Sequence, residues 1–181
     1  MKNAVIFLAD GTESCEALIT ADLLQRAGIH VTTASVMGRR EVLAAPKARI
    51  TADCMAEQAD YDRADVLVLP GGIPGVDHIR ANGTAMAQVR RFADEGRLLA
   101  AICAAPGILS DLGLLADKCA TVHPECTAGF HAKRISGEKA VQDGAIITGQ
   151  ALGGAFAFAL AIIRALVGAE AAAATKKQIC L

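Results

Sequence analysis

Short, continuously apolar runs separated by longer helical patterns are the feature that most constrains the fold of this chain. Residues 4–9, 66–69 and 98–102 are three such runs, with no polar side chain inside them. A strand that is apolar on both faces has to be covered on both faces, as happens in a parallel sheet with helices on each side. The sequence therefore predicts an α/β fold with a mainly parallel central sheet.

The rest of the chain continues this alternation. Further strands are expected at residues 31–36, 119–122 and 145–148, and helices at 14–27, 84–95, 152–167 and from about 106 onward. Residues 42–52 mix β-branched and polar side chains, which predicts a short hairpin or edge strands.

Length and charge limit the number of domains and the kinds of partner that this chain can have. The 181 residues suit one domain spanning 1–181, and 53% of them are hydrophobic. With 18 basic and 19 acidic residues the net charge is −1, which offers no electrostatic footprint for nucleic acid. The most apolar stretch, residues 151–163, is shorter than the roughly 20 residues of a membrane span, so a buried helix is expected there. Small-molecule partners fit this composition better than nucleic acid or a membrane.

The number and spacing of the cysteines indicate whether the protein works in a reducing or an oxidising compartment. Six are scattered along the chain without a C-x-x-C pair, and the first residues lead directly into a strand pattern without a secretory signal. We expect free thiols in a reducing cytoplasm.

Four turns follow directly after predicted strands, at residues 10–12, 70–72, 103–105 and 123–124. In open parallel sheets, ligands bind beyond the carboxyl ends of the strands. The functional residues are therefore expected in these turns.

Cys103 lies where the strand 98–102 turns toward the next helix, a layout that resembles a nucleophile elbow. The positions two before and two after it are Ala101 and Ala105, which crowd such a turn little, and Pro106 is tolerated in the first turn of a helix. The positive end of that helix is expected to lower the thiol pKa from about 8.5 toward roughly 3.5–7.5. The alternative interpretation is a small, inert core thiol.

Glu16 falls on the apolar side of the predicted helix 14–27, with Ile19 and Leu23 beside it on a helical wheel. A carboxylate among apolar side chains is costly to ionise, so its pKa should rise, and a protonated carboxyl can donate a hydrogen bond to a thiolate. A first-turn acid also favours a helix N-terminus electrostatically, and the two interpretations are compatible.

Three further positions complete the candidate site. The backbone N–H groups of Gly72 and Ala104 could stabilise an oxyanion, although a Pro-Gly-Gly sequence is also an ordinary turn. His123, directly after the strand 119–122, could act as a base or proton shuttle, or merely cap that strand.

A competing interpretation is a zinc site. Cys119, His123, Cys126 and His131 have the spacing C-x3-H-x2-C-x4-H. The spacing matches no common zinc finger, and a core this apolar needs no metal, so no metal is expected.

Four strings stand together in the order of a known family: Asp-Gly-Thr-Glu-Ser-Cys-Glu from residue 10, Val-Leu-Pro-Gly-Gly from 68, Ala-Ala-Ile-Cys-Ala-Ala-Pro from 100 and Val-His-Pro from 122. The chain resembles the ThiJ/PfpI superfamily and, within it, the branch of the Parkinson-disease protein deglycase (DJ-one). The similarity runs from about residue 2 to about residue 168.

This resemblance implies a flavodoxin-like three-layer sandwich and a homodimer. It also implies that Cys103 is the nucleophile and the oxidation-sensitive thiol, that Glu16 is its protonated partner, that Gly72 and Ala104 offer backbone donors, and that His123 lies nearby. Family members are credited with cofactor-free glyoxalase activity on methylglyoxal, removal of early glycation adducts, redox sensing and holdase chaperoning.

Two departures bear on the substrate. The protease-like branch has a histidine directly after the nucleophile, where this chain has Ala104, so peptidase chemistry is not expected. Near the site, where related chains carry two arginines, this chain has Pro46 and Gln150.

Three functions remain open from the sequence. The first is an enzyme in which Cys103 adds to a reactive carbonyl such as methylglyoxal while Glu16, with His123, moves a proton. The second is an oxidative-stress sensor or holdase chaperone that uses the same oxidisable cysteine. The third is a hydrolase or hydratase that acts on another small substrate.

Overall fold

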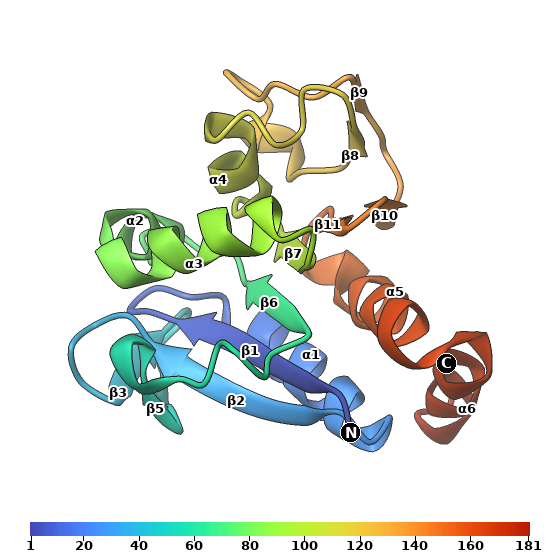
Figure 1. The fold of residues 1–181 in the computed structure, drawn as a ribbon, viewed down its shortest axis with the longest axis horizontal. Coiled ribbons are helices and arrows are strands. Elements are labelled where there is room, and N and C mark those ends of the chain that lie inside the picture. The colour runs from blue at the N-terminus through green and yellow to red at the C-terminus, as the bar shows by residue number, and fades with distance from the viewer.

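A seven-stranded sheet forms the centre of the computed structural model, which describes residues 1–181 (Figure 1). Its strands stand in the order β10-β11-β7-β6-β1-β2-β5. Their bounds are β1 Asn3–Leu8, β2 His30–Ser35, β5 Cys54–Met55, β6 Val66–Leu69, β7 Leu98–Ile102, β10 Ala140–Asp143 and β11 Ile146–Gly149. Every neighbouring pair is parallel except β10 and β11, which confirms the mainly parallel sheet.

Helices cover both faces of this sheet, as a flavodoxin-like fold requires (Figure 1). One face carries α2 (Gly75–Ala81), α3 (Gly83–Asp94) and α4 (Pro106–Asp111). The other carries α1 (Ser14–Arg26), α5 (Ala155–Val167) and α6 (Ala169–Gln178). No helix is both long and apolar enough to cross a membrane.

Strand β1 shows why the apolar runs are continuous. Val5 and Phe7 belong to the core under α2, α3 and α4, whereas Ala4 and Ile6 belong to the core under α1 and α5. Successive side chains of a strand point to opposite faces, so a strand between two helical layers needs an apolar residue at every position.

The region 42–52 forms the expected hairpin, with β3 (Glu41–Ala44) antiparallel to β4 (Ala48–Thr51). Its start is tied to the carboxyl end of β1, because the N–H of Gly11 donates to the carbonyl of Leu43 at 2.9 Å. The hairpin thus lies beside the turn that leads into α1.

The prediction of a strand at 119–122 in the central sheet is wrong in the length of the strand and in its pairing partner. Only Cys119–Ala120 is a strand, β8, and it pairs with β9 (Arg134–Ile135) in a separate two-stranded sheet. The segment contacts the central sheet through side chains instead. The N–H of Cys119 donates to Asp143 and the N–H of Thr121 donates to the hydroxyl of Thr148, both at 2.9 Å, so side-chain oxygens replace the ladder partners of a strand.

The last long helix also starts later than expected. Leu152–Gly154 forms a 3-10 turn and α5 begins at Ala155. Gly154 packs against the backbone of Lys139, and a Cβ at this position would lie 2.6 Å from the Lys139 carbonyl oxygen. The close approach of the two backbones fixes the entry to α5.

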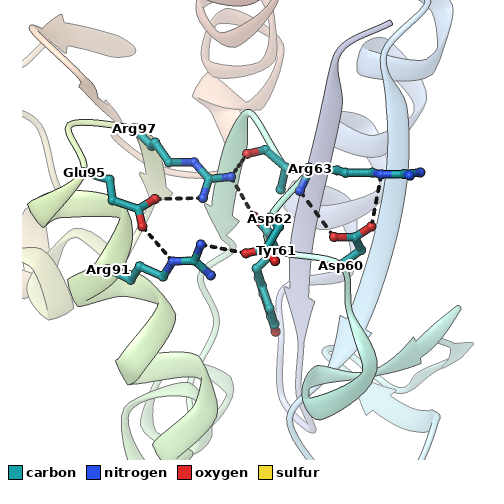
Figure 2. Close-up of polar contacts among 8 residues, drawn as sticks. Asp60, Tyr61, Asp62, Arg63, Arg91, Glu95 and Arg97 are labelled. Atoms are coloured by element: carbon teal, nitrogen blue, oxygen red, sulfur yellow. Dashed lines mark hydrogen bonds and ion pairs between the residues drawn. The ribbon is translucent and has the colours of Figure 1, made fainter.

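A polar network closes the amino end of the sheet, beside the starts of β6 and β7 (Figure 2). The Arg97 guanidinium donates to the carbonyls of Tyr61 and Ala64 and lies 3.9 Å from the centre of the Phe92 ring. Arg91 pairs with Glu95 at 2.8 Å and with Asp62 at 2.6 Å. The network holds residues 60–64 against α3 at the end of the sheet far from Cys103.

Candidate active site

Cys103 occupies a tight turn between β7 and α4. Its φ is +66°, in the left-handed region that side chains other than glycine adopt at a cost of roughly 1–3 kcal/mol. The turn is held by Cys103 N–H donating to the Gly149 carbonyl at 3.0 Å and Ala105 N–H donating to the Ile102 carbonyl at 3.1 Å. Cys103 is half-buried.

Glu16 lies in the first turn of α1 and is 1% exposed. Its Oε2 accepts a hydrogen bond of 2.9 Å from the Gly71 N–H, while its Oε1 is buried without a hydrogen-bond partner. The expected burial of this carboxyl on the inner side of α1 is confirmed.

Gly71 lies against both the Glu16 carboxyl and the Cys103 side chain. A Cβ placed on it would lie 2.5 Å from Cys103 Cβ and 2.6 Å from Glu16 Oε2. Only a residue without a side chain therefore lets Glu16 and Cys103 come together. The sequence indicated that the Gly-Gly pair lets the backbone approach a ligand closely. It did not indicate that Gly71 holds the Glu16 carboxyl, which depends on a contact with a distant segment.

Burial raises the pKa of Glu16 from 4.5 to about 7. The hydrogen bonds from the Gly71 N–H and the Cys103 thiol act in the opposite direction, and the charge of Glu13 adds a small increase. The cost of a charge in an apolar surrounding exceeds the gain from these two donors. The raised pKa expected from the sequence is therefore confirmed.

The pKa of Cys103 moves opposite to the expectation. Burial, followed by the charge and hydrogen bond of Glu16, raises the thiol pKa to about 12, and the N–H groups of Gly72 and Ala104 lower it only in part. The sequence argument relied on a helix N-terminus, but α4 has six residues and starts three positions after the sulfur. That argument also did not include the negative charge of Glu16, which raises the thiol pKa.

The two groups share one proton. A thiol beside an ionised Glu16 and a thiolate beside a protonated Glu16 have the same net charge, so the proton lost near pH 7 belongs to the pair. In the second arrangement Glu16 no longer repels the sulfur and becomes a hydrogen-bond donor to it.

The structure brings the backbone N–H groups of Gly72 and Ala104 near the sulfur, where both lower the pKa of the Cys103 thiol. Gly72 has a φ of +91°, and a Cβ on it would collide with the carbonyl of Gly11 and the N–H of Glu13. A glycine is therefore required where the turn after β6 crosses the turn after β1.

His123 lies next to Cys103 through the backbone, because its N–H donates to the Cys103 carbonyl at 2.9 Å. Its Nδ1 accepts from the N–H of Glu125 at 3.2 Å, which caps the 3-10 turn Pro124–Cys126. Nδ1 is thereby occupied, and Nε2 is left to carry the proton.

The alternative zinc ligands are not gathered into a site. No group of three or more histidine, cysteine, aspartate or glutamate side chains is placed to hold a metal ion. Cys119 belongs to β8, and the backbone N–H of His131 donates to Ser110 at 2.7 Å.

The two positions that depart from the family pattern are uncharged and held by local contacts. Gln150 Nε2 donates to the Gly137 carbonyl at 3.2 Å, and Pro46 is exposed after Ala45, whose carbonyl accepts from the Ser14 N–H at 3.2 Å. Neither side chain offers a cation for an anionic substrate.

A flavodoxin-like sheet with a thiol at a strand-to-helix turn and a buried carboxyl beside it defines a class of cysteine-centred α/β proteins. Residues 2–165 match the DJ-1/PfpI family, and the chain belongs to that family.

Relatives and solved structures agree with this assignment. The Parkinson disease protein 7 homolog of Danio rerio is 37% identical over 187 residues, covering 99% of this chain and 97% of its own. The glutathione-independent glyoxalase DJR-1.2 of Caenorhabditis elegans is 30% identical over 184 residues, with the same coverage of both chains. The structure of oxidized Toxoplasma gondii DJ-1 superposes with a TM-score of 0.95 at 28% identity, covering 99% of this chain and 98% of its own.

Proposed function

We propose that this protein is a cysteine-dependent, cofactor-independent enzyme of the glyoxalase or deglycase type, acting on reactive carbonyls such as methylglyoxal. The observation that carries the proposal is the approach of the Glu16 carboxyl to the Cys103 thiol across Gly71. The name of the Caenorhabditis elegans relative, a glutathione-independent glyoxalase, supports the same chemistry.

The reaction begins with the thiolate of Cys103. The sulfur adds to the aldehyde carbon of methylglyoxal, and the carbonyl oxygen takes up a proton to give a hemithioacetal. The N–H groups of Gly72 and Ala104, which lower the pKa of the thiol, support the thiolate before attack and the oxyanion formed beside it. Glu16 in its protonated form supplies the proton.

Glu16 then works as a base. The carboxylate removes the hydrogen of the former aldehyde carbon as a proton and returns it to the adjacent carbon. The hydroxyl proton on the first oxygen moves to the oxygen of that adjacent carbon, with His123 as a second carrier. The product is a lactoyl thioester of Cys103, which water hydrolyses to lactate and the free thiol. Methylglyoxal and one water give one lactate, so no oxidant or reductant is consumed. A pKa near 7 suits a group that has to give and take a proton at neutral pH.

The test is turnover of methylglyoxal by Cys103→Ser and Glu16→Gln, with Cys180→Ser as the matched control because Cys180 is an exposed thiol near the C-terminus. We expect Cys103→Ser to lose lactate formation entirely, Glu16→Gln to lose at least about 100-fold in kcat, as for removal of a proton-transfer group, and Cys180→Ser to match wild type. Full turnover by Cys103→Ser would contradict the proposal.

A redox sensor or holdase chaperone built on the same thiol is the second candidate. The unpartnered Oε1 of Glu16 favours it, because a protonated carboxyl there could donate a hydrogen bond to an oxygen added to the sulfur. Mild peroxide should then add two oxygens to Cys103 alone. Oxidation spread over all six thiols would contradict this candidate.

We further propose a homodimer in the cytoplasm. Leu18 on α1, Leu152 in the 3-10 turn before α5 and Phe156 on α5 are large apolar side chains that are 39–46% exposed, and α1 and α5 pack together. Large exposed apolar patches are typical of protein–protein interfaces. Light scattering should give twice the mass of 18.6 kDa, and a monomer at micromolar concentration would contradict the dimer.

A further inference from the structure

A cavity of about 180 Å³ lies between α2, α4 and residues 126–130, and Ala104, the residue after Cys103, is in its lining. Ile73, Ala104, Gly107, Cys126 and Phe130 are among its lining residues. Ile73 follows Gly72, and the backbone N–H groups of Gly72 and Ala104 lower the pKa of the Cys103 thiol. At roughly 30 Å³ per water the cavity has room for about six waters, enough for the tail of a small carbonyl compound.

Three charged side chains line this cavity, Asp77, Arg80 and Asp111. Arg80 pairs with Asp77 at 3.1 Å and with Asp111 at 2.9 Å. One guanidinium is thus shared by two carboxylates, which leaves a net charge of −1 and no free cation for an anionic ligand. The two carboxyls are 57–60% exposed, so salt should screen their effect.

We propose that this cavity receives the non-reacting part of the carbonyl substrate, and that Asp77 and Asp111 make it select neutral or cationic carbonyl compounds over anionic ones. The inference rests on the proposed function for the identity of the substrate.

Alkylation tests the charge selection without any turnover. Iodoacetamide and iodoacetate carry the same leaving group and differ in one negative charge. The ratio of their rates is measured at Cys103 and Cys126 by peptide mass spectrometry, and Cys180 gives the reference ratio in the same molecule. Glu125 next to Cys126 contributes equally in wild type and variants, so the change in the ratio reports Asp77 or Asp111 alone.

We expect Asp77→Asn to lower the iodoacetamide-to-iodoacetate ratio at Cys103 and Cys126 by about two- to fivefold at low salt, with no change at Cys180. Arg80→Gln should raise the ratio, because it removes the only cation. Both effects should disappear in roughly 1 M salt, where the Debye length is about 3 Å. Ratios that are equal in wild type and Asp77→Asn would overturn the inference.

Turnover tests the link to the reaction. The substrates are 4,5-dioxopentanoate, an anionic ketoaldehyde, and its neutral methyl ester. Asp77→Asn should raise kcat/KM for the acid relative to the ester by about two- to fivefold, whereas Glu170→Gln on α6 should leave the ratio unchanged. If the ester is turned over and the ratio stays constant, the cavity is not the substrate subsite. If neither compound is turned over, the proposed function fails, and the alkylation ratios still decide the charge selection.

Discussion

The backbone N–H of Gly71 donates a hydrogen bond of 2.9 Å to Oε2 of Glu16, and this bond fixes the carboxyl while leaving Oε1 unpartnered. The first consequence is that Gly71 tolerates no side chain, since a Cβ would lie 2.5 Å from Cys103 Cβ.

Gly71→Ala should therefore both destabilise the protein and abolish lactate formation. Overpacking in a tight core costs typically 1–3 kcal/mol, to be measured by urea unfolding. Gly137→Ala is the control, because its Cβ would meet nothing within 4 Å and its φ is not in the left-handed region. It should unfold within about 0.5 kcal/mol of wild type. An active Gly71→Ala protein of normal stability would show that a side chain at position 71 does not collide with Cys103 and Glu16.

The raised pKa of Glu16 makes stability depend on pH. The folded protein keeps this proton up to about pH 7, whereas the unfolded chain loses it near 4.5. Between these values the folded state binds more protons, so the free energy of unfolding falls as pH rises. Relative to Glu16→Gln, wild type should lose about 3 kcal/mol between pH 4.5 and 7 and change little from there to about pH 9, where the thiol of the unfolded chain begins to ionise. Unfolding curves at several pH values measure the difference, and parallel behaviour of the two proteins would contradict the raised pKa.

Because the backbone at position 103 is in the left-handed region, glycine should stabilise the protein more than alanine there, the reverse of their usual order. Cys103→Gly should be more stable than Cys103→Ala by about 1 kcal/mol, because alanine pays the left-handed penalty that glycine avoids. Thermal unfolding of the two variants gives the comparison. An alanine variant more stable than the glycine variant would mean that this turn is not strained.

The network in Figure 2 contributes to stability and not to the reaction. Arg97→Ala leaves the carbonyls of Tyr61 and Ala64 without their side-chain donor and removes the contact with Phe92, which should cost about 1–3 kcal/mol. Arg63→Ala, at a side chain that is 83% exposed, should cost less than about 0.5 kcal/mol. Turnover per folded molecule should be unchanged in both variants. Loss of turnover in stably folded Arg97→Ala would contradict this separation.

Local signals predicted much of this architecture. The apolar runs predicted the parallel sheet, and the turn after 98–102 predicted the position of Cys103, because both depend on short stretches of sequence. The side of α1 that Glu16 occupies follows from helical periodicity, so its burial and raised pKa were accessible too.

The remaining features depend on contacts between distant segments. The thiol pKa is raised partly by a carboxylate from another element. Residues 119–121 stay out of the central sheet, and the N–H groups of Cys119 and Thr121 donate to side chains of β10 and β11 instead. The cavity beside Cys103 joins α2, α4 and residues 126–130, which no local pattern connects.

The central claim is that Cys103 and Glu16 share one proton, and the pH dependence of Cys103 alkylation by iodoacetamide tests it most directly. In wild type the rate should rise tenfold per pH unit up to about pH 7, level off, and rise again only in strongly alkaline solution. In Glu16→Gln the step near pH 7 should be absent, leaving a single thiol titration. Superimposable profiles for the two proteins would contradict the account.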